Sequence, residues 1–479
     1  MTSIVEYIEQ EVVVSSGDAI RYAEKELGIT NEAARKKIQR LPAYIYRIKG
    51  ICRDGQSILY HKNNWTNIDF LDKLTEVIKN DAQQHYAVLN AINLYSGLIP
   101  KSILAEYTLS PIENVKGHKR FSTIIDDLKR LRLIDETGDF YVGENKAYNE
   151  KRSKALSLIN EMTLAHFHEW GRNIGLFSYD SAKFHSGLSS YQFAMVAPSY
   201  INSLAQKTNN RIIPAFIVAD ILLNRDILKN DIDFFIKKLE NVSMRNRSAK
   251  IIPFLLVGSH DKDVHQVLKS KGIIIGNIDE LFGKQYSESV YGILNLIENA
   301  GAILKSNPDQ YIKLIDSIKS LSTGKTFNLR GALFEMAVGY FHGQQCQTLE
   351  VSKKVISDQE SREIDVYAVY QDKVVFAECK GYNTKVDDGY ISKWLSEKIP
   401  VIRRWALSCE SICDKPMVFE IWSTGGFTDD ANIRLSAAHQ NTKKYQVNFY
   451  DSFHMLKVAK EKKISQFSEI VNSYFTRDV

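Results

Sequence analysis

The sequence has few of the features that mark exported or membrane-bound proteins. Its five cysteines, at positions 52, 346, 379, 409 and 413, are too few and too irregularly spaced for a disulfide framework. No uninterrupted apolar run reaches about 18 residues, so we expect no transmembrane helix. The first residues, MTSIVEYIEQEVVV, have no basic start, so we expect no secretory signal. These absences predict a cytoplasmic protein with no membrane partner.

The sequence also has little excess of charge of either sign. The 62 lysines and arginines exceed the 57 acidic residues by five, a slight lean toward nucleic acid that decides nothing by itself. Hydrophobic residues make up 44% of the chain and its mean hydropathy is -0.25, which is typical of a folded, water-soluble protein. At 479 residues the chain is too long for one hydrophobic core, so we expect several domains.

Residues 18–62 predict two helices followed by two short strands. Asp18 is the expected N-cap of the first helix, Gly28 ends that helix, and Thr30 is the expected N-cap of the second helix. The segments AYIYRIKGI and SILYHK are rich in β-formers and are separated by Arg-Asp-Gly. This order resembles a winged-helix domain, whose second helix enters the major groove of DNA. The alternative is a small helical domain whose basic residues are simply solvated.

The winged-helix resemblance makes the basic residues of the second helix and of the wing candidates for DNA contact. They are Arg35, Lys36, Lys37, Arg40, Lys49 and Arg53. Residues 84–144 predict a similar order of elements, with a helix that ends near Leu131 and a strand pair around Thr137–Asp139. Because this helix carries Asp126 and Asp127, we expect the second copy to bind DNA less well and to serve protein contacts.

After about residue 150, strands alternate with helices, as in α/β domains. One order of elements occurs twice, on either side of about residue 300, and it ends each time in a strand followed by a helix. Identity between the two segments is low, so they represent either a duplication or a coincidence. Where the second segment has Glu378-Cys379-Lys380, the first has Ala219-Asp220-Ile221 and no lysine. If the two are duplicates, the first is an inactive copy with a structural, dimerising or sensing role.

The stretch EIDVYAVYQDKVVFAECKGY, residues 363–382, carries charges on what should be buried strands. Glu378 and Lys380 are two residues apart, so they point to the same face of a strand. In a hairpin Asp365 lies near Glu378, and two close carboxylates repel each other unless a cation lies between them. A hard divalent cation suits such oxygen ligands. The alternative is an ordinary surface hairpin, because Glu-x-Lys is a common tripeptide.

A glutamate on a helix, an aspartate on a strand and Glu-x-Lys on the next strand resemble the PD-(D/E)xK nucleases of the restriction endonuclease-like superfamily. The helix is GALFEMAVGYFHG, which contains Glu335. Over about residues 325–460, the phrase FEIWSTGGFTDDANIRLSAAH is similar to that of the Mrr-like branch. Two departures are Ile364, where many members have proline before the aspartate, and Glu378, where Mrr-like proteins often have glutamine.

The resemblance implies a role for each residue of this set. Asp365, Glu378 and the backbone carbonyl of Cys379 would bind Mg²⁺, for which Mn²⁺ can substitute. Lys380 would be the catalytic lysine, and Glu335 would assist the metal or hold Lys380. On the following helix, Arg403 and Arg404 either contact DNA phosphates or are solvated.

We therefore expect a multidomain protein of the α/β and α+β classes. The expected parts are a winged helix at 1–64, a winged-helix-like domain at 65–150, an α/β domain (an inactive nuclease-like copy) at 151–300, and at 301–479 a restriction endonuclease-like domain with a central mixed sheet. The resemblance implies a metal-dependent endonuclease that cuts double-stranded DNA as a homodimer, in restriction or phage defence. The alternatives are a DNA-binding regulator or scaffold with an idle nuclease domain, and an enzyme that a partner protein targets.

Overall fold

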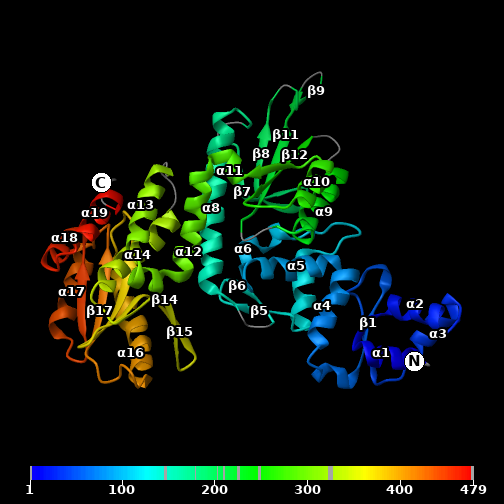
Figure 1. Cartoon of the computed structure of the whole chain (residues 1–479), viewed down its shortest axis with the longest axis horizontal. Coiled ribbons are helices and arrows are strands. Elements are labelled where there is room, and N and C mark those ends of the chain that lie inside the picture. Colours follow the sequence, from blue (N-terminus) through cyan, green and yellow to red (C-terminus); the bar gives the residue numbers. More distant parts are fainter. Residues whose placement is uncertain are drawn as a thin grey trace. The chain divides into compact units, whose positions relative to one another are not determined.

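Two units make up the chain in the computed structural model (Figure 1). The structure describes residues 3–144, 148–177, 180–201, 203–208, 211–223, 227–245, 250–321 and 327–475. The first unit comprises Met1–Ser153 and Phe167–Asn277, and the second comprises Lys154–His166 and Ile278–Val479. The boundary expected between residues 300 and 301 lies within helix α12 (Lys284–Ser306). Among the described residues, no helix is both long enough and apolar enough to cross a bilayer.

The first module of the first unit is a small sheet with three helices, drawn in blue in Figure 1. The strands form an antiparallel sheet in the order β1-β3-β2. Ile8, Val14, Ala34, Ile38 and Leu59 belong to its core. The elements are α1 (Ile4–Glu11), β1 (Val13–Ser15), α2 (Ser16–Glu26), α3 (Asn31–Gln39), β2 (Ile45–Ile48), the turn η1 (Arg53–Gly55), β3 (Ile58–His61) and the turn η2 (Lys62–Thr66).

The helix caps of this module correct one expectation and confirm another. Ser15, and not Asp18, is the N-cap of α2, because its Oγ accepts a hydrogen bond from the Asp18 backbone N–H at 3.0 Å. Asp18 lies in the first turn, where its carboxylate accepts a hydrogen bond from Ser15 Oγ at 2.7 Å. Its negative charge there interacts favourably with the positive end of the helix dipole. Thr30 caps α3 as predicted, and Gly28 has the positive φ of 64° that the preceding turn requires.

The second module of the first unit repeats the topology of the first. Its antiparallel sheet has the order β4-β6-β5, so the last of its three strands lies between the first and the second, as in β1-β3-β2. After the linking helix α4 (Phe70–Asp81), the elements are α5 (Gln83–Leu94), β4 (Leu98–Pro100), α6 (Lys101–Leu104), the turn η3 (Ala105–Tyr107), α7 (Phe121–Arg130), β5 (Ile134–Thr137) and β6 (Phe140–Gly143).

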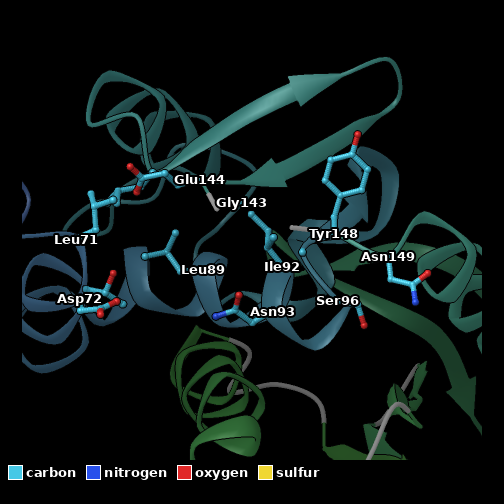
Figure 2. Close-up of a pocket in the computed structure, with 13 residues that line it drawn as sticks. Leu71, Asp72, Leu89, Ile92, Asn93, Ser96, Gly143, Glu144, Tyr148 and Asn149 are labelled. Carbon is cyan, nitrogen blue, oxygen red and sulfur yellow. The ribbon is translucent and has the colours of Figure 1, made fainter. Parts of the chain in front are cut away.

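A pocket of about 560 Å³ lies in the second module (Figure 2). Leu89 and Ile92 of α5 contribute apolar lining, and Asp72, Glu144 and Asn149 contribute polar lining. Burial raises the pKa of Glu144. The lining includes none of the residues predicted to be catalytic, so this pocket is not the site that the sequence indicates.

The middle domain, residues 183–277, has a five-stranded mixed sheet in the order β13-β12-β11-β8-β7, drawn in green in Figure 1. β7, β8 and β11 are antiparallel, whereas β11, β12 and β13 are parallel. The elements are β7 (Lys183–Leu188), β8 (Tyr191–Ser199), the ribbon β9 (Gln206–Thr208) and β10 (Arg211–Ile213), β11 (Ala215–Leu222), α9 (Lys229–Arg245), β12 (Ile251–Val257), α10 (Lys262–Ser270) and β13 (Ile274–Asn277).

The C-terminal domain, residues 278–475, has a second five-stranded mixed sheet, in the order β14-β15-β16-β17-β18. Its strands are β14 (Thr348–Ser357), β15 (Glu360–Val369), β16 (Val374–Lys380), β17 (Met417–Ser423) and β18 (Gln446–Tyr450). β14, β15 and β16 are antiparallel, and β16, β17 and β18 are parallel. The strand order and directions are therefore those of the middle domain, in agreement with the repeated layout of the sequence.

Helices cover both faces of this second sheet. Val374, Phe376 and Ile421 share a core with Ile391 and Leu435 from the helices on one face. On the other face, Trp422 packs against an aromatic ring of α14 and one of α19. The helices and turns of this domain are α11 (Ile278–Phe282), α12, α13 (Asp309–Leu321), α14 (Phe327–Gly343), α15 (Asp388–Lys393), the π-helical turn η4 (Trp394–Lys398), α16 (Ile399–Ser408), α17 (Asp429–Asn441), α18 (Ser452–Glu461), α19 (Ser465–Ile470) and η5 (Val471–Phe475). Helix α8 (Glu150–Asn173) has residues in both units.

A buried ion pair lies at the centre of the middle domain. Lys238 of α9 pairs with Asp220 of β11, and both side chains are buried. Lys238 also donates to the backbone carbonyls of Gln192, on β8, and Glu106, in turn η3 of the second module. The strand residues next to Asp220 include no lysine, but the following helix supplies Lys238. Because Lys238 donates to residues of both parts, it links the second module to the middle domain.

We predict that Lys238→Met destabilises the chain by about 3–5 kcal/mol, because it leaves Asp220 buried without a counter-ion. Adding Asp220→Leu should restore much of the loss, since an apolar pair then replaces the ion pair. Urea unfolding followed by circular dichroism measures both effects. The control is Lys271→Met, which breaks an exposed pair with Glu240 and should cost about 1 kcal/mol or less. Equal stability of Lys238→Met and wild type contradicts the prediction.

Candidate active site

The four residues predicted to be catalytic lie on three neighbouring elements of the C-terminal domain. Glu335 is on α14, Asp365 is on β15, and Glu378 and Lys380 are on β16. The β15–β16 ladder ends at the pair Val366–Ala377, so Asp365 lies one residue beyond it, beside Glu378. The backbone N–H of Cys379 donates a hydrogen bond to Asp365 Oδ2 at 2.7 Å. Strand pairing therefore fixes the aspartate next to the glutamate.

Both oxygens of the Glu378 carboxylate have partners. Its Oε1 lies 3.0 Å from Lys380 Nζ and accepts a hydrogen bond from the Tyr390 hydroxyl. Its Oε2 forms an ion pair with Lys398. Only 4% of the Glu378 side chain is exposed. A carboxylate this buried is costly unless cations and hydrogen bonds surround it, and here they do.

Lys398 contacts both acids of the strand pair. Besides its ion pair with Glu378, its Nζ lies 3.9 Å from Asp365 Oδ1. Lys380 lies on the other side of Glu378, with its Nζ 4.7 Å from the centroid of the Tyr390 ring. The site thus consists of two carboxylates bridged by the Lys398 ammonium, with a second ammonium, that of Lys380, beside Glu378.

Glu335 is partly buried close to this group. It accepts a hydrogen bond from Ser352 Oγ at 3.1 Å. Ser352 interrupts the β14–β15 ladder, with a φ of 54° between the paired residues Val351 and Lys353. Backbone in this left-handed region is strained for serine, and such strain often accompanies functional sites. Burial, together with repulsion from Asp365 and Glu363, raises the pKa of Glu335 well above its usual value.

Burial and charge move the two strand acids in opposite directions. Burial and repulsion from Glu378 raise the pKa of Asp365 to about 7, against the attraction of Lys398. Burial also acts to raise the pKa of Glu378, but the attraction of Lys398 and Lys380 outweighs it and lowers that pKa below the usual value. The pKa of Lys380 is raised despite burial, by Glu378 and then Asp365. At neutral pH, Glu378 and Lys380 are therefore charged.

The donor set suits a hard divalent cation. Within the residues that the structure describes, no three His, Cys, Asp or Glu side chains are arranged to hold a metal. Mg²⁺ needs fewer, because it commonly takes one or two carboxylates together with water and substrate phosphate. Asp365 and Glu378 supply two carboxylates, and Cys379, whose carbonyl the resemblance implies as a third ligand, directly follows Glu378 in the chain. A cation is already accommodated there, since the Lys398 ammonium lies within 4 Å of both acids.

Lys398 and Tyr390 are the site residues that the sequence analysis did not assign. Both come from the segment after β16, in which Tyr390, Trp394 and Lys398 recur every four residues. This spacing places side chains on one helical face, and Trp394 is buried, so the face toward the sheet could have been identified. The π-helical turn η4 was not predictable, although such turns often occur at functional sites.

The residues predicted to contact DNA lie in different surroundings. Arg35, Lys36, Lys37 and Arg40 of α3 are exposed, as are Lys49 and Arg53 beyond β2; of these, Lys36 forms an ion pair with Glu32 at 2.7 Å. In the C-terminal domain, Arg404 forms ion pairs with Asp358 at 3.0 Å and Glu360 at 2.8 Å, and the Nε of Arg403 is buried. The basic residues of the first module are thus more accessible than Arg403 and Arg404 of the C-terminal domain.

The acids of the second module are engaged within the module. Asp127 of α7 pairs with Lys119 at 2.6 Å, Arg130 at 2.7 Å and His85 at 3.2 Å. Because α7 occupies the place of α3 in the repeated topology, the two helices differ mainly in charge. The exposed cations of α3 have few acidic neighbours, whereas those of α7 are largely neutralised.

We predict that Asp365→Asn raises thermal stability at about pH 8 in the absence of divalent ions. A folded pKa near 7 lies above the ordinary value of 3.8, so the folded chain holds the proton more tightly and loses stability as pH rises from about 4 to about 7. Each pKa unit corresponds to about 1.4 kcal/mol. Thermal unfolding across this pH range should show that Asp365→Asn is more stable than wild type near pH 8 and that this difference vanishes toward pH 4.

The matched control for that experiment is Asp358→Asn, at an exposed aspartate of the same domain. It should change stability little and without this pH profile. If Asp365→Asn is less stable than wild type at every pH, the ionised Asp365 carboxylate stabilises the fold and the prediction is wrong.

Comparisons with known proteins add little to this geometry. No protein-family model matches the chain, and a search of curated proteins found no match. Among solved structures, restriction endonuclease FokI bound to DNA is similar, with 12% identity and a TM-score of 0.18, over 56% of this chain and 58% of that one. Protein VC1899 from Vibrio cholerae is similar with 11% identity and a TM-score of 0.17, over 58% of this chain and 81% of that one. The chain thus spans less than two thirds of the FokI chain, and likeness at this level establishes neither fold nor function.

Proposed function

We propose that the protein is a metal-dependent DNA endonuclease of the PD-(D/E)xK type, similar to the Mrr-like branch. The observation that carries this proposal is the group formed by Asp365, Glu378 and Lys380 where the β15–β16 ladder ends. Glu335 on the preceding helix and the parallel strand β17 complete the order of elements that the resemblance implies. The likeness to the FokI structure is too weak to add support.

In the proposed site, Asp365, Glu378 and the Cys379 carbonyl would hold Mg²⁺ or Mn²⁺. Such an ion supplies a water of lowered pKa and neutralises charge on the phosphate. Lys380 remains protonated near neutral pH, because its pKa is raised, so it orients the attacking water and stabilises the negative charge that develops at phosphorus. The water attacks in line with the leaving oxygen and inverts the phosphorus; its proton passes to solvent, and the leaving oxygen gains one.

Glu335 suits a supporting position in this scheme. Its burial and raised pKa favour a neutral carboxyl, which is a poor metal ligand but a suitable neighbour for the ionisable Asp365. Its hydrogen bond is to Ser352, whereas the ion pair of Lys380 is with Glu378. These contacts favour a role for Glu335 beside Asp365 over a role in holding Lys380.

The first module would bind double-stranded DNA as a winged helix. Its order of helices and strands, and a sheet in the order β1-β3-β2, support this assignment. In it α3 is the helix that enters the major groove, and its exposed cations would contact phosphates. The second module and the middle domain would be structural; in the middle domain, the strand acid Asp220 is buried in an ion pair with Lys238. Cutting both strands would require a homodimer, and restriction or phage defence is the context that the resemblance implies.

One observation favours a second candidate, a DNA-binding regulator or scaffold with an idle nuclease domain. Both oxygens of Glu378 already have partners in Lys380, Tyr390 and Lys398. If these contacts do not yield to a metal ion, the domain is inactive by itself. Activity would then be absent or would depend on a partner protein.

We predict that the wild-type chain cleaves plasmid DNA with Mg²⁺ or Mn²⁺, and that Asp365→Ala and Lys380→Ala each reduce the rate at least about 100-fold. Gel electrophoresis of the products over time measures the rates. Lys457→Ala, at an exposed lysine of α18, is the control and should cut like wild type. Cutting that survives both site changes rules out these residues as the catalytic group. If the wild type binds DNA but cuts with neither metal, the regulator is favoured.

We predict that the triple change R35A/K37A/R40A weakens binding to a DNA duplex and lowers the slope of log K against log salt by up to about 3, since each phosphate contact contributes about 0.9. Fluorescence anisotropy at several salt concentrations measures both quantities. The matched control is K129A/R130A on α7, where the cations form ion pairs with Glu136 and Asp127. Unchanged affinity of the α3 variant refutes DNA binding by this helix.

A further inference from the structure

Lys398 occupies a place that the proposed chemistry does not assign to it. Its ammonium forms an ion pair with Glu378 Oε2 and lies 3.9 Å from Asp365 Oδ1, so it bridges the two proposed metal ligands. Lys380 and Tyr390 also contact Glu378, but at Oε1. Among the described contacts of the site, the ion pairs of Lys398 are therefore the ones that reach an oxygen of each acid.

We propose that Lys398 is a positioning residue that competes with the divalent ion for Asp365 and Glu378. The lysine holds the two carboxylates together, and the ion binds as the ammonium moves away from their shared side. This inference rests on the proposed metal-dependent function. It adds a built-in threshold, because metal binding has to break two ion pairs of the chain.

The backbone at Lys398 differs from an ordinary helix. Lys398 is the last residue of the π-helical turn η4, and the N–H of the next residue, Ile399, donates to the carbonyl of Trp394, five residues earlier. Such a turn inserts one extra residue between α15 and α16 and changes the direction of the side chains that follow. The turn brings Lys398 to the strand ends, and 19% of its side chain is exposed to solvent.

The middle domain provides an internal comparison. There, Lys238 comes from the uninterrupted helix α9, donates to Asp220 and to two backbone carbonyls, and is 0% exposed. That lysine has no route to solvent and satisfies all three of its donors within the fold. Lys398 makes ion pairs with carboxylates and retains partial access to water. The two domains thus place a lysine in the same topological position, fully buried in one and partly exposed to solvent in the other.

The test is the binding of Mn²⁺ to the full chain without DNA, measured from the electron paramagnetic resonance signal of the free ion. Lys398→Met and Lys398→Gln should each bind at least about tenfold more tightly than wild type, because the competing ammonium is gone. Lys398→Arg should bind like wild type, because the guanidinium restores the positive charge. Unfolding curves confirm that each variant is folded, and Asp365→Asn should abolish binding in every background.

Lys380→Met is the matched control for a general charge effect, since it removes an equal charge beside Glu378 from the other oxygen. If Lys380→Met tightens Mn²⁺ binding as much as Lys398→Met does, competition by Lys398 is overturned. It is also overturned if Lys398→Met and Lys398→Gln bind Mn²⁺ no more tightly than wild type. In both cases, loss of binding in Asp365→Asn leaves the proposed metal site standing. If neither wild type nor any Lys398 variant binds Mn²⁺, the proposed metal site fails and the inference fails with it.

Discussion

Repulsion between two buried carboxylates, Asp365 and Glu378, is the constraint on which the C-terminal site depends. The sheet forces the two groups together, because antiparallel pairing of β15 with β16 places Asp365 beside Glu378 and the Cys379 N–H fixes it there. Two nearby negative charges in a poorly solvated place are stable only with cations between or beside them. The lysine of the strand, Lys380, and the turn that brings in Lys398 both meet this requirement, and the proposed divalent ion would meet it too.

The middle domain meets a related requirement in another way. It has the same strand order and directions, but one acid, Asp220, in place of two, and its lysine closes a fully buried pair. The second module adds a backbone carbonyl from η3 to that lysine, so the charge becomes part of an intramolecular junction. One topology therefore supports both a partly exposed pair of acids and a fully buried ion pair.

Alternation along a strand made Glu378 and Lys380 predictable from the sequence, and the hairpin made the nearness of Asp365 predictable. Local patterns also predicted α3, α7 and their turns. They did not predict Ser15 as the cap of α2, because Ser15 and Asp18 are both good capping residues and packing chose between them. Nor did they reveal Lys238 or Lys398, since each reaches its acid from a helix about 20 residues further along the chain, through an arrangement that only the fold specifies.

The buried pair of the middle domain has an evolutionary consequence. Asp220 and Lys238 depend on each other for stability, so loss of either leaves an isolated charge in the interior. A lineage can therefore exchange the two together for apolar residues, but a chain that changes only one of them passes through a poorly folded intermediate. The two positions should therefore change together in evolution.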